Sequence, residues 1–219
     1  MAVPPPSTTV LRETPLVRAL HTAIRDQGAS RHSFVTNSDR LVQMLIEEAL
    51  GLLPATPVTV TTPCGPYEGV SLPEESTIVA VSILRAADCM LGVCRAMMPS
   101  VAVGKILIQR NEETAEPMLM YAKLPASLAD RPILLLDPML ATGGSAVTAV
   151  NVLLEKGAKA ENIVFVNIVA VKEGIDKLAA AHPAVRVVTS AIDPILNEKA
   201  YIVPGLGDFG DRYFGTDGM

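Results

Sequence analysis

The chain has 219 residues, of which 49% are hydrophobic and 19% are charged, and its formal net charge is −5. This composition excludes an intrinsically disordered chain, because a chain of this length and apolar content can bury a substantial core as a single domain. The net negative charge supplies no overall basic field, so we expect no nucleic-acid partner.

The cysteines and the absence of long apolar runs indicate where the protein resides. Cys64, Cys89 and Cys94 form no CxxC pair, which favours reduced thiols in a cytoplasmic protein over a disulfide framework or a zinc site. The amino terminus lacks the apolar stretch of a signal peptide. No window approaches the roughly 20 consecutive apolar residues that a membrane helix needs, so we expect no membrane partner.

The first third of the chain predicts a leader, a helix and a hairpin. Residues 1–15 are proline-rich and predict a mobile leader, which is followed by a single domain over residues 16–219. Residues 38–51 predict a helix with Ser38 as its cap and an apolar stripe at helical spacing. The stripe consists of Leu41, Leu45, Ile46 and Ala49. Residues 58–72 alternate in polarity around a Gly-Pro turn, which predicts a β-hairpin.

Apolar strands and helical segments then alternate along the chain. The strands near residues 133, 163 and 186 are apolar at nearly every position, which is typical of parallel strands covered on both faces. The alternation predicts an α/β fold, with a central, mostly parallel sheet flanked by helices. Residues 192–219 form an irregular tail rich in glycine and aspartate. Strands are expected over 76–85, 101–110, 117–124, 133–137, 162–171 and 185–192, and helices over 86–97, 145–158 and 172–183.

The segment ILLLDPMLATGGSAV, residues 133–147, has the composition of a ligand site. Asp137 ends an apolar strand, which is where open parallel sheets bind ligands. The glycine pair in the turn 142–145 lets the backbone approach an anion at the start of a helix, while an aspartate suits sugar hydroxyls. We interpret the segment as a site for a phosphorylated sugar. The alternative is a tight strand-to-helix turn with an aspartate cap, and a Walker A loop is excluded because its lysine is absent.

Residues 134–146, LLLDPMLATGGSA, resemble the phosphoribosyl pyrophosphate (PRPP) motif of type I phosphoribosyltransferases. Pro138 stands where most of that superfamily has a second acid, and the uracil phosphoribosyltransferases share this replacement. Further motifs of that family occur in the expected order. They are SILRAAD at 82–88, QRNEETAEP at 109–117 and YIVPGLGDFGDRYFGT at 201–216. The resemblance to the uracil phosphoribosyltransferase family covers the chain from about residue 15 to its end.

The resemblance implies a type I phosphoribosyltransferase fold with an irregular C-terminal hood that binds the base. It also implies an enzyme of pyrimidine salvage that converts uracil and PRPP to UMP and diphosphate. The residues implied at PRPP are Arg85, Arg110, Asp137, Pro138, Met139, Leu140, Ala141, Thr142, Gly143, Gly144, Ser145 and Asp208. Those implied at uracil are Tyr201, Ile202, Gly207, Asp208 and Phe209.

Within that set, Arg85 and Arg110 would hold the pyrophosphate group, and Arg110 would lie on a loop that folds over the site. The cofactor implied is Mg²⁺ carried by PRPP, with no direct protein ligand and with Asp208 reaching it through water. Without the resemblance, Arg85 is equally well interpreted as a surface arginine at a strand end. The segment 110–116 is then a solvated hairpin tip.

Two positions depart from the family pattern. Ala87 replaces a usual glycine, and it would strain the loop after Arg85 if that loop needs a backbone angle that only glycine adopts. Phe209 replaces a common alanine. Because the implied contacts with the base are largely main-chain, Phe209 predicts altered packing around the base with the pocket retained.

The sequence GLGDFG at residues 205–210 matches the GxGxxG pattern of dinucleotide-binding sites. No apolar strand of the right kind precedes it, and the segment DRYFGT at 211–216 makes a poor helix. We therefore reject a dinucleotide site.

Partners and alternative functions follow from the same resemblance. The family usually forms dimers or larger assemblies and GTP activates some members, so a homodimer or homotetramer and a GTP effector are expected. One alternative is a PRPP- or UMP-binding regulatory protein that acts on nucleic acid, which the acidic charge disfavours. The other is a phosphoribosyltransferase for a different base.

Overall fold

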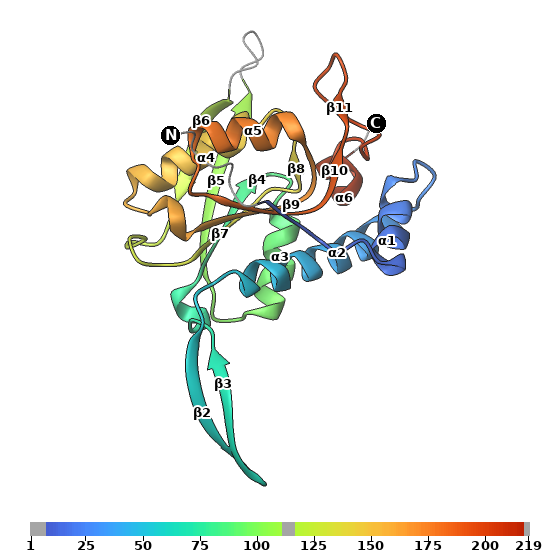
Figure 1. Ribbon diagram of the computed structural model, residues 1–219. Helices are drawn as coiled ribbons and strands as arrows, with labels where there is room; N and C mark the ends of the chain where they lie inside the picture. Colours follow the sequence, from blue (N-terminus) through green and yellow to red (C-terminus); the bar gives the residue numbers. More distant parts are fainter. Residues whose placement is uncertain (1–7, 111–116, 217–219) are drawn as a thin grey trace.

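The computed structural model describes residues 8–110 and 117–216, and a mostly parallel β-sheet lies at its centre (Figure 1). The strand order is β1–β10–β9–β7–β4–β5–β6, and β8 pairs with β9. Among the described strands of this sheet, only β6 runs antiparallel to its neighbour, β5. The predicted α/β class is confirmed. The strands are β1 (Thr8–Val10), β4 (Val79–Leu84), β5 (Ala102–Arg110), β6 (Pro117–Lys123), β7 (Ile133–Leu136), β8 (Met139–Leu140), β9 (Ile163–Val171) and β10 (Arg186–Asp193).

All residues of strand β7 are apolar because the strand lies between two layers of helices. Leu134 and Leu136 face one core layer and Ile133 and Leu135 face the other, and all four side chains are fully buried. Successive side chains of a strand point to opposite faces, so a strand between two helical layers needs apolar residues at every position. The first layer contains α1 (Pro15–Arg25), α2 (Arg31–Gly51) and α3 (Asp88–Met97), and the second contains α4 (Gly144–Glu155) and α5 (Lys172–Ala181) (Figure 1).

Helix α2 is longer than predicted. It begins at Arg31, and the hydroxyl of Ser30 accepts a hydrogen bond from the Ser33 amide at 3.2 Å. The expected cap, Ser38, is fully buried in the middle of the helix, so that assignment is wrong. The physical reason is that the apolar face extends back to Phe34, one turn before Ser38, and a small serine fits within a buried helix face.

The amino-terminal boundary also differs from the prediction. Residues Thr8–Val10 form β1 and pair in parallel with Val187–Thr189 of β10, so the expected leader is structured from residue 8 onward. Thr14 then caps α1, its hydroxyl accepting a hydrogen bond from Val17 at 3.2 Å. The part of the predicted leader before residue 8 lies outside the described residues.

The predicted hairpin forms and lies apart from the central sheet (Figure 1). It consists of β2 (Thr56–Thr62) and β3 (Gly65–Ser71), paired antiparallel. The tail is more regular than expected, because it contains the paired strands β11 (Ile195–Leu196) and β12 (Ile202–Val203) and the short helix α6 (Phe209–Phe214). Short 3₁₀ turns occur at Glu75–Thr77 and Ala160–Asn162.

Helix α6 corrects the expectation that residues 211–216 make a poor helix. The Asp208 carboxylate accepts a hydrogen bond from the Asp211 amide at 2.9 Å, and Gly215 ends the helix in the left-handed conformation. Both ends are therefore capped, which stabilises even a short helix. In residues 8–110 and 117–216, no helix has the length and apolar character needed to cross a membrane.

Candidate active site

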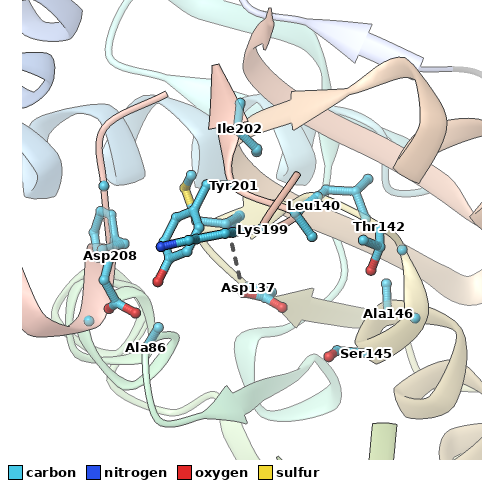
Figure 2. A pocket seen from close by; sticks show the side chains of 18 residues that line it. Ala86, Asp137, Leu140, Thr142, Ser145, Ala146, Lys199, Tyr201, Ile202 and Asp208 are labelled. Atoms are coloured by element: carbon cyan, nitrogen blue, oxygen red, sulfur yellow. Dashed lines mark hydrogen bonds between the residues drawn. The ribbon is translucent and has the colours of Figure 1, made fainter. Parts of the chain in front are cut away.

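A cavity of about 300 Å³ opens beyond the carboxyl end of β7. One wall is the loop that leads from β7 into α4, and the other is the C-terminal tail, which is distant in sequence. Figure 2 shows Tyr201 and Asp208 on one side, Thr142 and Ser145 on the other, and Asp137 between them. Of the residues singled out from the sequence, those lining the cavity are Asp137, Met139, Leu140, Ala141, Thr142, Gly143, Gly144, Ser145, Tyr201, Ile202, Gly207, Asp208 and Phe209.

The loop after β7 is held on both sides of Asp137. The Asp137 amide donates to Val166 of β9 at 3.2 Å, and its half-buried carboxylate accepts from the Met139 amide at 3.4 Å. Met139 and Leu140 form β8 and pair with Val169 and Ala170 of β9. The carboxylate is thus presented from a backbone that the sheet itself fixes.

Gly143 makes the turn into α4 with φ of 76° and is the residue immediately before the helix. A Cβ atom there would lie 2.8 Å from the carbonyl oxygen of Gly174 in α5, so a side chain is excluded by space as well as by backbone angle. The first amides of α4 have no partners within the helix, and they carry the partial positive charge of a helix start. This turn therefore offers an anion site in the cavity wall.

The tail supplies the opposite wall. Tyr201 is 48% exposed, whereas Ile202 and Phe209 are buried. The Phe209 ring packs against Phe34 at 5.2 Å and stacks on Tyr213 at 5.8 Å between ring centroids. These contacts account for a large aromatic side chain at position 209, because its ring belongs to the core behind the wall.

Arg85 lies at the rim and not in the wall, although its neighbour Ala86 lines the cavity. Its guanidinium donates to Asp211 at 2.6 Å and to Thr216 at 2.8 Å, and the side chain is 54% exposed. The Thr216 hydroxyl and the Arg85 guanidinium lower the pKa of the Asp211 carboxyl. Ala87 has φ of −72° and ψ of −3°, an ordinary helical conformation, so the strain considered for this position is absent.

Two further predicted residues lie elsewhere. Pro138 is buried behind the wall, and its carbonyl accepts hydrogen bonds from Ile168 at 2.9 Å and Val169 at 3.1 Å. Arg110 is the last residue of β5. The Arg110 side chain and the loop that follows it lie outside the described residues.

The cavity also contains residues that the sequence did not indicate. They are Ala86, Ala146, Lys199, Ala200 and Gly210. Lys199 follows Asn197, whose side-chain oxygen accepts hydrogen bonds from the amides of Lys199 and Tyr201, both at 3.0 Å. An asparagine that organises a turn four residues before the tail motif is a signal that could have drawn attention to Lys199.

The family model for uracil phosphoribosyltransferase matches residues 10–216. The chain belongs to the uracil phosphoribosyltransferase family. A uracil phosphoribosyltransferase from Dictyostelium discoideum is 52% identical over 214 residues, which cover 97% of this chain and 98% of that protein. The predicted family is confirmed.

Solved structures agree with this assignment. A protein from Aquifex aeolicus superposes with a TM-score of 0.82 at 34% identity, covering 94% of this chain and 97% of that one. An adenine phosphoribosyltransferase from Trypanosoma brucei superposes with a TM-score of 0.58 at 12% identity, covering 89% of this chain and 87% of that one. The second likeness bears on the fold alone, and it confirms the predicted phosphoribosyltransferase architecture.

Proposed function

We propose that the cavity is the active site of a uracil phosphoribosyltransferase that joins uracil to PRPP, forming UMP and releasing diphosphate in pyrimidine salvage. The observation that supports this most strongly is that the Asp137 loop and the glycine-rich tail, far apart in sequence, line the same cavity. One wall suits a phosphorylated sugar and the other suits a planar base. Their juxtaposition is what a reaction between the two requires.

The sugar phosphate occupies the wall formed by the β7–α4 loop. Backbone amides and hydroxyls of Thr142–Ser145 bind the 5′-phosphate, since they lie at the start of α4. The Asp137 carboxylate accepts hydrogen bonds from the ribose hydroxyls. Met139, Leu140 and Ala141 complete the contact along the loop, and Pro138 shapes its backbone from behind.

Uracil occupies the wall formed by the tail. Main-chain groups of Ile202, Gly207 and Phe209 face the edge of the base, and Tyr201 and Asp208 lie beside them. Backbone N–H and C=O groups can match a base edge in the way a second base does. A ring nitrogen of uracil then displaces diphosphate at the anomeric carbon, through a transition state with positive charge on the sugar.

The leaving diphosphate needs positive charge nearby. Arg85 at the rim and Arg110, the last residue of β5, supply it. Asp137 and Asp208 are the carboxylates in the cavity wall, and they fit Mg²⁺, which binds through one or two carboxylates, waters and substrate phosphates. When bound, Mg²⁺ neutralises diphosphate charge, with Asp208 contacting it through water.

Incubation of the purified chain with PRPP, Mg²⁺ and a panel of bases tests this function. We expect UMP from uracil and little product from cytosine, adenine or hypoxanthine. Product from another base in place of uracil would favour a phosphoribosyltransferase of different specificity. No product with any base, together with retention of RNA or DNA on a filter at low salt, would favour the regulatory alternative.

Asp137→Asn tests the ribose contact. The amide keeps one acceptor oxygen but loses the charge, and a hydrogen bond to a charged group contributes about 1.5–3 kcal/mol. We therefore expect KM for PRPP to rise roughly tenfold, with a smaller change in KM for uracil. The matched control is Asp130→Asn, an exposed carboxylate that pairs with Lys159, and it should leave both constants unaltered. Equal changes for both substrates in Asp137→Asn would contradict the assignment.

We propose further that the chain assembles as a homodimer or homotetramer. Val58, Val60 and Tyr67 are 37%, 46% and 61% exposed, and the pairing register places them on one face of the β2–β3 hairpin. An exposed apolar face of this kind suits a second copy of the chain. Analytical ultracentrifugation should show an oligomer that Val60→Glu weakens and Thr61→Glu, on the opposite face, does not. A wild-type monomer at all concentrations would contradict the proposal.

We propose further that GTP is an effector of the enzyme and that the protein resides in the cytoplasm. A rise in turnover or a change in assembly on addition of GTP would support an effector role, and the absence of both would refute it.

A cytoplasmic location is consistent with three free cysteines. Burial raises the pKa of Cys94 to about 12 and raises that of Cys89 as well, so these two thiols stay protonated. Microscopy of the tagged chain tests the location.

A further inference from the structure

The tail that forms the base side of the cavity is fastened to the end of helix α1 by charged side chains. They are Arg25, Asp193 and Arg212, and none of them lines the cavity. Arg25 is the last residue of α1, Asp193 ends β10, and Arg212 lies in α6. Each reaches the backbone just before Gly207 and Asp208, which do line the cavity.

Arg25 and Asp193 form a bidentate ion pair. The two terminal guanidinium nitrogens of Arg25, Nη1 and Nη2, donate to the two carboxylate oxygens of Asp193 at 2.7 and 2.8 Å. Asp193 is 6% exposed, and the Arg25 side chain is 21% exposed. A bidentate pair fixes the relative orientation of the two side chains. Its net contribution to the free energy of folding is small, because both charges lose hydrating water.

The same pair holds both main-chain groups of Gly205. The Gly205 amide donates to Asp193 at 2.9 Å, and its carbonyl accepts from Arg25 at 2.9 Å. Gly205 has φ of 59°, and a Cβ atom there would lie 2.0 Å from the carbonyl oxygen of Ile202. The ion pair therefore fixes a tight turn that ends β12 and starts the base-binding segment.

Arg212 holds the next residue. Its guanidinium donates to the Leu206 carbonyl at 2.6 Å and to the carbonyls of Ile24 and Asp26 at 2.7 and 2.6 Å. The guanidinium lies over the Phe34 ring, 4.3 Å from its centroid. Gly205 and Leu206 are thus both tied to the carboxyl end of α1, and Gly207 follows immediately.

We propose that Arg25 and Asp193 are positioning residues for recognition of the base. The proposal rests on the proposed function, in which main-chain groups of the tail read the edge of uracil. Hydrogen bonds weaken steeply when the donor angle or distance departs from its optimum. A backbone that reads a base must therefore be held in place, and the buried ion pair does this from behind the wall.

The test compares Asp193→Asn and Arg25→Lys with wild type in the full-length protein. Loss of the bidentate pair should raise KM for uracil about tenfold, equivalent to about 1.4 kcal/mol, and leave KM for PRPP close to the wild-type value. Discrimination between uracil and cytosine should fall as well. Arg25→Lys keeps the charge and provides a milder variant if Asp193→Asn folds poorly. Because the two residues act as one unit, the double variant should be little worse than Asp193→Asn.

Arg131→Lys is the matched control. Arg131 also holds main-chain carbonyls, those of Thr77 at 2.8 Å and Ser76 at 2.7 Å, but at the amino end of β4, away from the cavity. The Arg131→Lys substitution should lower the melting temperature without changing KM for uracil or KM for PRPP. Equal shifts in both KM values, or a loss of stability alone in the Arg25 and Asp193 variants, would overturn the proposal. A wild-type chain that makes no UMP would instead refute the proposed function.

Discussion

Gly174→Ala is expected to lower kcat/KM for PRPP at least about a hundredfold, because a displacement of about 1 Å in substrate-positioning groups can reduce rate by that factor. Gly174 lies in the first turn of α5, against the loop that leads from β7 into α4. A Cβ atom there would lie 2.3 Å from the Ala141 carbonyl oxygen and 2.8 Å from that of Leu140. Both contacts are with backbone, so no side chain can rotate away, and the loop itself must move.

Gly92→Ala provides the control for this substitution. Gly92 also lies in a helix, α3, but a Cβ atom there would meet nothing within 4 Å. We expect wild-type kinetics and a gain in stability of about 0.5–1 kcal/mol, since alanine is the better helix former. Steady-state kinetics with PRPP as the varied substrate, together with circular dichroism, decide the comparison. Normal PRPP kinetics in a folded Gly174→Ala protein would show that the loop does not depend on α5.

Arg85→Ala is expected to lower kcat/KM for PRPP by about ten- to a hundredfold, the equivalent of one charge-assisted contact of about 1.5–3 kcal/mol. In the structure the Arg85 guanidinium is bound to Asp211 and Thr216 at the cavity rim. A diphosphate carries more charge than one carboxylate, so it can compete with Asp211 for the same guanidinium nitrogens. The free energy of unfolding should change little, because the pair is exposed.

Arg95→Ala is the control for the loss of positive charge. Arg95 is an exposed arginine in the last turn of α3. Its removal changes the net charge by the same amount at a place outside the cavity wall. The two variants are compared in initial-rate assays over a range of PRPP concentrations. Equal kinetics for the Arg85 and Arg95 variants would remove Arg85 from the PRPP site.

The sheet could be predicted from the sequence because its signals are local. Each residue of β7 is apolar, and so are nearly all residues of β9, since both strands lie between two layers of helices. The turn 142–145 carries its glycines at the position where the chain must approach α5 closely. In both cases the composition of a short segment is determined by what surrounds it, so the surroundings can be inferred from the sequence.

The elements that were missed depend on partners far away in the chain. The residues Thr8–Val10 are β-branched but too few to predict a strand by themselves, and they become a strand by pairing with β10 almost 180 positions later. Ser38 has the chemistry of a cap, but the burial of Phe34 places it inside the helix. The motif around Arg85 predicts an anion site, which stays a prediction, whereas the contacts of Arg85 with Asp211 and Thr216 could not be foreseen. Tertiary context decides such cases.

A crystal structure of the chain with PRPP and Mg²⁺ tests the central claim most directly. We predict that the Asp137 carboxylate accepts hydrogen bonds from the ribose hydroxyls and that the amides of residues 142–145 donate hydrogen bonds to the 5′-phosphate. Density for PRPP elsewhere, or an Asp137 side chain turned away from the sugar, would contradict the account.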